Sequence, residues 1–302
     1  MSDFSITGIR LGVAQAGIKY EGRDDLTLIE IAEGSHTAAV FTQNAFRAAP
    51  AVVAERHVAS QDARYLLINS GNANAGTGEA GMDACERSCV AVATQTNTQA
   101  RHVLPFSTGV IGEVLPIAKI EAALPNAVGD LTATNWNRAS RAIMTTDTRP
   151  KLRRCALDFK GQSCEIVGMS KGSGMIQPNM ATMLGFIATD AYIPGALLDT
   201  MLRRAVNASF NRITLDGDTS TNDAVTLTAT GQSDFRISTL SSNEAIAFQS
   251  ALTELATALA QDIVRDGEGA TKFVEITVLG AASEVEADQV ARTVAHSPLV
   301  KT

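Results

Sequence analysis

The chain contains 302 residues, of which 45% are apolar and 19% charged, and its formal net charge is −7. This length and composition are ordinary for a globular protein with a substantial core. The acidic excess, with no block of basic residues, argues against nucleic acid or a membrane surface as a partner. Because the sequence shows neither a signal peptide nor an apolar run long enough to span a bilayer, we expect a cytoplasmic protein.

The first part of the chain is predicted to contain short strands with turn-rich connections. Three strands are expected, at 26–31 (LTLIEI), 37–42 (TAAVFT) and 64–69 (RYLLIN). A Gly/Asn-rich loop at 70–81 then leads into a helix at 83–96. The segment 103–113, VLPFSTGVIGE, is predicted to be a second loop because glycines interrupt it.

The later part mixes strands and helices in the same way. MLGFIAT (183–189) is predicted to be a buried strand, and Pro194 to begin a helix. The apolar side of that helix carries Leu197, Leu198, Met201 and Leu202. This mixture throughout the chain indicates an α/β or α+β protein, and the pattern by itself does not fix the strand order.

Two capping boxes and one further strand are predicted near the end of the chain. Ser241 with Glu244, and Ser283 with Glu286, have the spacing that begins a helix. Between those two helices, FVEITVL (273–279) alternates apolar and polar residues as a strand does.

Cysteine and histidine residues give weak signals for chemistry. The four cysteines, Cys85, Cys89, Cys155 and Cys164, fit a reducing compartment. Cys85 and Cys89 lie one helical turn apart, but no histidine lies near them in sequence to complete a metal site, so we interpret them as buried hydrophobic residues. The four histidines, His36, His57, His102 and His296, stand in unrelated contexts. Folding could still bring one of them to a serine or cysteine, but none lies in a recognisable catalytic or metal-ligand motif.

Two segments imitate ligand-binding loops without completing the motif. GVAQAGIK (12–19) has Ile18 where a phosphate loop has its lysine. TLDGDTSTND (214–223) is rich in aspartate but lacks the distal glutamate of a calcium loop, so we interpret it as scaffold.

The stretch MSKGSGMIQPNMATMLGFIATDA (169–191) places Thr182 between a glycine-rich loop and a strand. A threonine can act as a nucleophile without histidine if its own α-amino group is free to accept the hydroxyl proton, since that group has a pKa of roughly 7.7–8.0. The Ala181–Thr182 bond would then have to be cut, which the hydroxyl can do by attacking the preceding carbonyl. Threonines also begin strands routinely, and both interpretations stay open at this point.

The same stretch, KGSGMIQPNMATML (171–184), closely resembles the self-cleaving segment of the ornithine acetyltransferase (glutamate N-acetyltransferase) family of arginine biosynthesis. The resemblance covers essentially the whole chain, and further segments match in the family's order. They are AGIK (16–19), FTQN (41–44), AAPAV (48–52), NSGNANAGTG (69–78), STGVIGE (107–113), IMTTDTRPK (143–151), TLDGDTSTND (214–223) and DGEGATK (266–272).

The resemblance implies roles for individual residues. Thr182 matches the nucleophile, freed by cleavage after Ala181 and then acetylated. Thr108 and Gly109 match the pair that stabilises the oxyanion, which is physically reasonable for a hydroxyl and a backbone N–H. Substrate contacts are matched by Thr148, Lys171, Glu268 and Thr182 itself, and no metal is implied.

The resemblance also implies a fold and an assembly. We expect an α+β, four-layer αββα-type sandwich of the self-cleaving ornithine acetyltransferase/DmpA-like class over 1–282, with 283–302 beginning a C-terminal domain. Cleavage would give an α piece (1–181) and a β piece (182–302), and two of each would form a heterotetramer. Family members continue beyond the point that matches Thr302, and an Asn and a Ser/Thr there complete the site. We therefore expect the sequence to be truncated.

The implied activity is transfer of acetyl from N-acetylornithine to glutamate through an acetyl-Thr182 enzyme, in ping-pong order. Acetyl-CoA is a possible second donor, no prosthetic group is implied, and the sequence does not separate the monofunctional from the bifunctional enzyme. Two alternatives remain: a self-cleaving N-terminal-nucleophile aminopeptidase of the same fold, and a non-catalytic small-molecule binding protein in which Thr182 is never freed.

Overall fold

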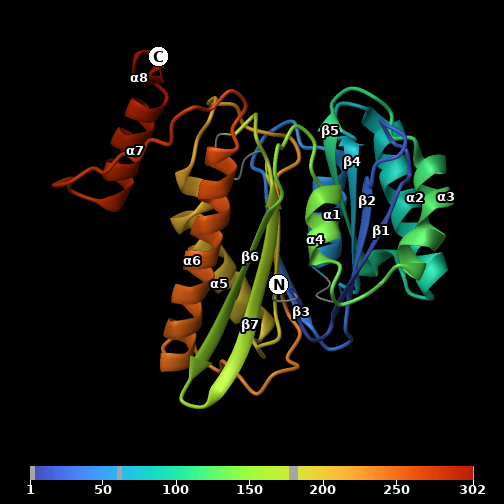
Figure 1. The fold of residues 1–302 in the computed structure, drawn as a ribbon, viewed down its shortest axis with the longest axis horizontal. Coiled ribbons are helices and arrows are strands. Elements are labelled where there is room, and N and C mark those ends of the chain that lie inside the picture. Colours follow the sequence, from blue (N-terminus) through green and yellow to red (C-terminus); the bar gives the residue numbers. More distant parts are fainter. Residues whose placement is uncertain (1–3, 60–62, 177–182, 302) are drawn as a thin grey trace.

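Two β-sheets lie face to face in this protein, and helices cover the outer side of each (Figure 1). The computed structural model describes residues 4–59, 63–176 and 183–301. The first sheet has the order β1-β2-β4-β5 and consists of Ile9–Ala14, Leu26–Ile31, Tyr65–Asn72 and Val103–Val110. The second has the order β3-β9-β8-β7-β6 and consists of His36–Phe41, Ala224–Ala229, Leu184–Thr189, Gln162–Lys171 and Lys151–Phe159.

The helices complete four layers. Helices α2 (Gly78–Thr96) and α3 (Ile117–Gly129) cover the first sheet, and α5 (Gly195–Ala208) and α6 (Asn243–Arg265) cover the second (Figure 1). Two further helices, α1 (Ala49–Val58) and α4 (Trp136–Ala142), contribute side chains to the core between the sheets. The predicted αββα sandwich is therefore confirmed.

Apolar side chains from both sheets fill the space between them. Phe106 of β5 and Phe186 of β8 meet edge to face, with ring centroids 5.1 Å apart. Trp136 of α4 is fully buried in the same layer. Because each sheet also buries its other face under helices, its strands are apolar on both sides, which explains the near-continuous burial of β2 and β8.

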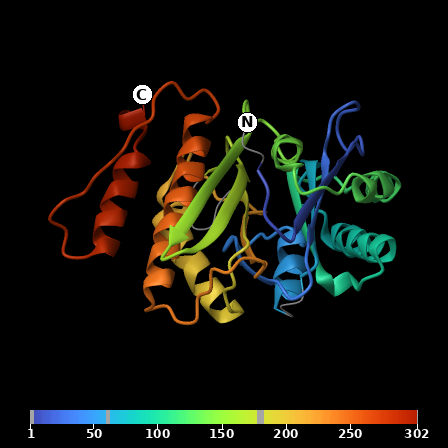
Figure 2. The ribbon, with the colours of Figure 1, turned by 60° about the horizontal axis from the view of Figure 1, so that its bottom comes forward.

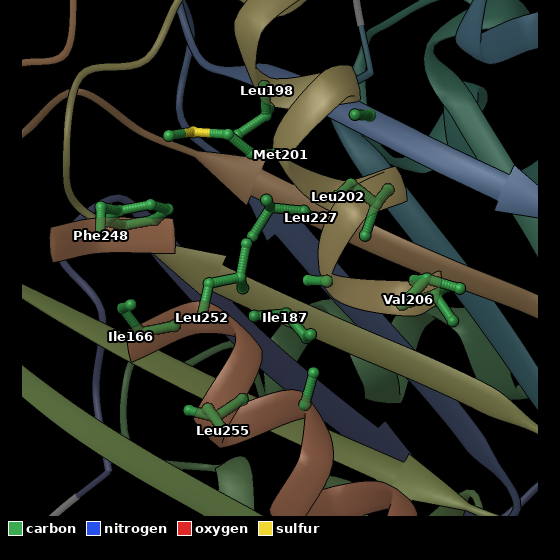
Figure 3. Close-up of a cluster of buried hydrophobic side chains, with 14 of the residues drawn as sticks. Ile166, Ile187, Leu198, Met201, Leu202, Val206, Leu227, Phe248, Leu252 and Leu255 are labelled. Carbon is green, nitrogen blue, oxygen red and sulfur yellow. The ribbon is translucent and has the colours of Figure 1, made fainter. Parts of the chain in front are cut away.

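A second core lies between the second sheet and helices α5 and α6. Figure 3 shows Leu198, Met201 and Leu202 of α5 in one cluster with Ile187 and other strand side chains. The helical repeat of three and four residues places these leucines on one face. Of the predicted face, Leu198, Met201 and Leu202 are buried, and Leu197 is half-buried against the same core.

Most of the predicted elements are present. The strand at 26–31 is found with the predicted bounds, and the strands at 37–42, 64–69 and 183–189 are found with shifted ends. Pro194 precedes α5, and Ser283 begins α7 (Glu284–Ala295) by accepting a hydrogen bond from the backbone N–H of Glu286. Helix α7 and the short α8 (Pro298–Lys301) lie on the far side of α6 from the sheet (Figures 1 and 2).

The prediction of a loop at 103–113 was wrong over most of its length. Residues Val103–Val110 form β5, which pairs in parallel with β4. The apolar residues at its start favour a strand more than the glycines favour a loop. Val103 packs in the core beneath α2 and α3, and Leu104 and Phe106 pack in the core between the sheets.

The strand predicted at 273–279 was also wrong. Alternation alone does not make a strand: its backbone needs a neighbour, and no strand in the described part of the chain pairs with it. Helix α6 is present, but its cap is Ser242 rather than Ser241. The Ser242 side chain accepts from the Ala245 backbone N–H at 3.1 Å, while Ser241 lies one residue too early. None of the described helices is both long enough and apolar enough to cross a membrane.

Candidate active site

The predicted site residues gather where strand ends of the two sheets meet. Thr108 and Gly109 lie near the end of β5, Lys171 is the last residue of β7, and Glu268 follows α6. All four line one cavity of about 1500 Å³. Residues separated by up to 160 positions in sequence therefore line one cavity, and the roles assigned to them stay predictions.

The Lys171 ammonium is the centre of this cluster. Its Nζ donates to Thr108 Oγ1 at 3.0 Å and to Thr145 Oγ1 at 2.9 Å, and it lies 4.0 Å from Asp147 Oδ2. Lys171 is only 5% exposed. Burial lowers the pKa of Lys171, and the charge of Asp147 opposes that change.

A chain of buried charges continues away from the cavity. Lys151 Nζ lies 2.6 Å from Asp147 Oδ1 and 2.6 Å from Asp266 Oδ2, and the Lys151 side chain is 1% exposed. Asp147 Oδ1 also accepts from the Gly172 backbone N–H at 2.7 Å, and its Oδ2 accepts from that of Thr145 at 3.1 Å. The pKa values of Asp147 and Asp266 are lowered: burial opposes ionisation, but the nearby lysines and the hydrogen bonds outweigh it. Asp147 thus connects Lys151 to the loop beside Lys171.

Thr148 belongs to this chain of charges rather than to the cavity wall. Its hydroxyl donates to Asp266, and its backbone N–H donates to the same carboxylate at 3.1 Å. Thr145 and Thr146 of the same TTDT segment line the cavity instead, and Thr148 is not among the lining residues. Three threonines within four residues could not be distinguished from sequence alone, because their orientation depends on how the loop turns around Asp147. The role assigned to Thr148 stays a prediction.

The end of strand β5 that carries Thr108 and Gly109 requires glycine at position 109. Gly109 has φ +135°, and a Cβ built on it would lie 2.3 Å from the carbonyl carbon of Gly71 on the neighbouring strand. The parallel pairing of β4 with β5 places Ser70 opposite Thr108 and Gly71 opposite Gly109. Two backbones therefore approach closely at this point, which only a residue without a side chain permits.

Glu268 is held beside the segment that follows Lys171 by a main-chain contact. Its backbone N–H donates to the Ser173 carbonyl at 2.7 Å, and Gly174 leaves room for its carboxylate, since a Cβ there would lie 2.8 Å from Oε1. The exposed Glu268 side chain and the buried Lys171 ammonium thus bring opposite charges to one cavity.

The predicted nucleophile Thr182 and the predicted cleavage pair Ala181–Thr182 lie outside the described residues. The chain on either side is held by the TLDGDTSTND segment (214–223). Asp216 accepts from the backbone N–H of Ile176 at 2.8 Å and also from that of Met175, while Asp223 Oδ1 accepts from that of Met183 at 2.7 Å. Asp223 is buried, and burial raises its pKa well above the usual range.

The weaker candidates are structural. Among the described residues, no group of three or more His, Cys, Asp or Glu side chains could hold a metal ion. Cys85 and Cys89 are buried in the core of the first sheet, and burial raises the pKa of Cys89 to about 12. Such thiols are poor nucleophiles, which agrees with their interpretation as buried hydrophobic residues.

Solved structures share the fold. An ornithine acetyltransferase of Mycobacterium tuberculosis, solved as a complex with ornithine, is 31% identical with a TM-score of 0.52, over 59% of this chain and 97% of that one. The arginine biosynthesis bifunctional protein of Bacillus halodurans is 32% identical with a TM-score of 0.52, over 59% of this chain and 94% of that one. An aminopeptidase of Ochrobactrum anthropi, described as a variant of the Ntn hydrolase fold, is 11% identical with a TM-score of 0.53, over 87% of this chain and 85% of that one, a likeness of fold alone.

Sequence comparison is more specific. The arginine biosynthesis bifunctional protein ArgJ of Methylococcus capsulatus is 58% identical over 297 residues, which are 98% of this chain and 72% of that protein. The protein of the same name from Pseudomonas syringae is 50% identical over 98% of this chain and 73% of its own length. The profile of the ArgJ family matches residues 10–302. This chain therefore belongs to the ArgJ family.

Proposed function

We propose that this protein is an acetyltransferase of arginine biosynthesis, which moves acetyl from N-acetylornithine to glutamate through an ester on Thr182. The observation that carries the proposal is the Lys171 ammonium, buried in a cavity and hydrogen-bonded to Thr108 and Thr145. A buried cation beside a hydroxyl, at a strand end with a backbone N–H, suits a reaction in which negative charge develops on a carbonyl oxygen. The names of the family relatives support the same activity.

Self-cleavage comes first in this mechanism. The Thr182 hydroxyl attacks the carbonyl of Ala181, the peptide bond to the Thr182 nitrogen breaks, and an ester forms. Water then hydrolyses the ester, which leaves a carboxylate on Ala181 and a free α-amino group on Thr182. This amino group is the general base of the following steps.

Acetyl transfer follows by the same chemistry. The Thr182 amino group takes the hydroxyl proton, and the oxygen attacks the acetyl carbonyl of N-acetylornithine. Thr108 and Gly109 stabilise the oxyanion of the tetrahedral intermediate. The proton passes to the leaving α-amine of ornithine, and the acetyl ester remains on Thr182. The amine of glutamate then attacks this ester, which gives N-acetylglutamate and returns the proton to the Thr182 hydroxyl.

Lys171 and Glu268 are the charged groups that hold the substrate in this proposal. A carboxylate and an ammonium on one amino acid can pair with the two opposite charges that line the cavity. Thr145 is the better candidate for the threonine contact, since it lines the cavity and touches Lys171, whereas Thr148 bonds Asp266.

The two pieces should stay together after cleavage. Strand β7 belongs to the α piece and β8 to the β piece. They are antiparallel neighbours, paired from Ile166 opposite Thr189 to Lys171 opposite Leu184. Each piece thus contributes strands to one sheet and side chains to one core. Assembly into a heterotetramer of two α and two β pieces is the further expectation, tested by comparing native mass with the masses of the denatured pieces.

The decisive experiment replaces Thr182 in the product of the complete gene. Thr182→Ala should remain one chain by intact mass and make no N-acetylglutamate, while Thr182→Ser should retain some cleavage because it keeps a hydroxyl. A Thr182→Ala protein that still splits and still transfers acetyl would refute the mechanism. Release of free acetate without N-acetylglutamate would favour an aminopeptidase-like hydrolase.

Two further assays address co-substrates and cofactors. Glutamate acetylation with acetyl-CoA alone would establish the bifunctional enzyme, and its absence would establish the monofunctional one. We propose that no metal takes part, so a strong chelator should leave the rate unchanged, and loss of activity that added metal restores would contradict this.

A further inference from the structure

The contact between Lys171 and Thr108 joins the two sheets at the site. Lys171 ends β7 of the second sheet, and Thr108 lies near the end of β5 of the first. The Nζ–Oγ1 distance is 3.0 Å, and the two residues are 5% and 8% exposed. A side chain that served only to hold a substrate would not need to touch the residue matched to the oxyanion site.

The chemistry of the two groups fixes the direction of this hydrogen bond. An ammonium carries three N–H donors and no acceptor. Among the described residues, Lys171 Nζ has Thr108 Oγ1 and Thr145 Oγ1 as hydrogen-bond partners, and Asp147 Oδ2 lies 4.0 Å away. Thr108 must therefore accept from Lys171, so its own hydroxyl proton points elsewhere and remains available to a second acceptor.

We propose that Lys171 is a positioning residue for the oxyanion site, acting through Thr108. By donating to Thr108 Oγ1, it directs the Thr108 hydroxyl proton toward the oxyanion of the tetrahedral intermediate. Its positive charge also polarises that hydroxyl, because linked hydrogen bonds strengthen one another in a buried setting. This inference rests on the proposed acyl transfer at Thr182, and it adds a role for Lys171 in the chemical step besides substrate binding.

Asp147 keeps the arrangement in place. Its carboxylate faces Lys171 and also accepts from the backbone N–H groups of Gly172 and Thr145. Gly172 directly follows Lys171, and Thr145 supplies the second hydroxyl that Lys171 contacts. One buried carboxylate thus fixes both the backbone next to the lysine and the loop on its other side.

The two roles of Lys171 differ for an acyl donor without a carboxylate. p-Nitrophenyl acetate offers nothing for a carboxylate-binding lysine to hold, but its carbonyl develops the same oxyanion when Thr182 attacks. Release of p-nitrophenolate measures that step, and intact mass of the β piece identifies acetyl on Thr182. Thr182→Ala gives the background rate.

If Lys171 acts through Thr108, Lys171→Met should slow this acylation by roughly 10²–10³-fold, as loss of one oxyanion donor does. Thr108→Val should slow it similarly, and Thr108→Ser should recover much of the rate because it restores the hydroxyl. The double variant should be only a few-fold slower than the worse single variant, because both remove the same interaction. Thr146→Val is the matched control: Thr146 also lines the cavity, but its hydroxyl bonds Ser173 at 2.7 Å, so its effect should multiply with that of Lys171→Met.

A second measurement needs no turnover. In the protein labelled with ¹³C-lysine, Thr108→Val should lower the pKa of Lys171, because an acceptor that stabilises the ammonium is lost. We expect both results: a lower Lys171 pKa in Thr108→Val, and a double variant only a few-fold slower than the worse single variant. An unchanged Lys171 pKa would overturn the inference, as would Lys171→Met that acylates within about threefold of wild type while raising KM for N-acetylornithine. Failure to transfer acetyl from N-acetylornithine, with the p-nitrophenyl acetate results as expected, would instead refute the proposed function alone.

Discussion

Removing Lys151 tests the buried chain of charges that ends at the site. Lys151 lies 2.6 Å from one oxygen of Asp147 and 2.6 Å from one oxygen of Asp266, and all three side chains are at most 2% exposed. Lys151→Met keeps the length of the side chain but leaves two buried carboxylates without their shared cation. Breaking a buried pair typically costs about 3–5 kcal/mol. We expect the lower end of this range, because Lys171 still lies 4.0 Å from Asp147 and Arg149 3.9 Å from Asp266.

The assay is urea unfolding, followed by circular dichroism, in a Thr182→Ala background that intact mass shows to be one chain. We expect a lower midpoint with an unchanged slope, which indicates lower stability rather than a different unfolded state. Arg154→Met is the matched control on the same strand: Arg154 pairs with Glu165 at 2.7 Å, but its side chain is 35% exposed, and such pairs contribute about 0–1 kcal/mol. If Lys151→Met costs no more than Arg154→Met, the network is not a buried ionic structure and the reasoning is wrong.

Three further changes test the end of strand β5, the core and the acidic network. Gly109→Ala should lose far more stability than Gly112→Ala by thermal unfolding, since both have positive φ but only Gly109 meets a neighbouring backbone; equal losses would contradict the clash. Leu252→Ala, in the fully buried core of Figure 3, should cost about 2–5 kcal/mol in urea unfolding, and a cost below 1 kcal/mol would show that the core is loosely packed. The pKa values of Asp147 and Asp266 are lowered, so their contribution to stability is present above the unfolded pKa near 3.9 and is lost as the pH falls through the folded values. The urea midpoint of Asp266→Asn should therefore fall less steeply than that of wild type as the pH is lowered from 6 to 3. An equal slope would refute this.

Local patterns in the sequence were enough to predict many of the elements. Buried strands such as Leu26–Ile31 and Leu184–Thr189 are short apolar runs between turn residues, and the apolar face of α5 follows the helical repeat. The four-layer arrangement came from the resemblance, because no local pattern specifies which strand lies beside which. The parallel pairing of β8 with β9 across α5 is an example of such a long-range choice.

The parts that could not be predicted depend on partners distant in sequence. VLPFSTGV became a strand because β4 pairs with it, whereas FVEITVL stayed irregular because no described strand does. The two threonines differ in their partners: the Thr145 hydroxyl accepts from Lys171, whereas the Thr148 hydroxyl donates to Asp266. Composition near a site thus predicts which segments take part, but the orientation of each side chain follows from contacts that only the folded chain supplies.

The position proposed for the cut explains how the fold could survive it. The residue pairs between β7 and β8 run from Ile166 opposite Thr189 to Lys171 opposite Leu184. A break between residues 181 and 182 removes none of them. Asp216 binds the backbone before this region and Asp223 the backbone after it, both from the segment 214–223. That segment precedes β9, which pairs with β8 in the same sheet. The described flanks of the cleavage region, at Ile176 and Met183, are therefore held by hydrogen bonds that do not depend on the bond between residues 181 and 182.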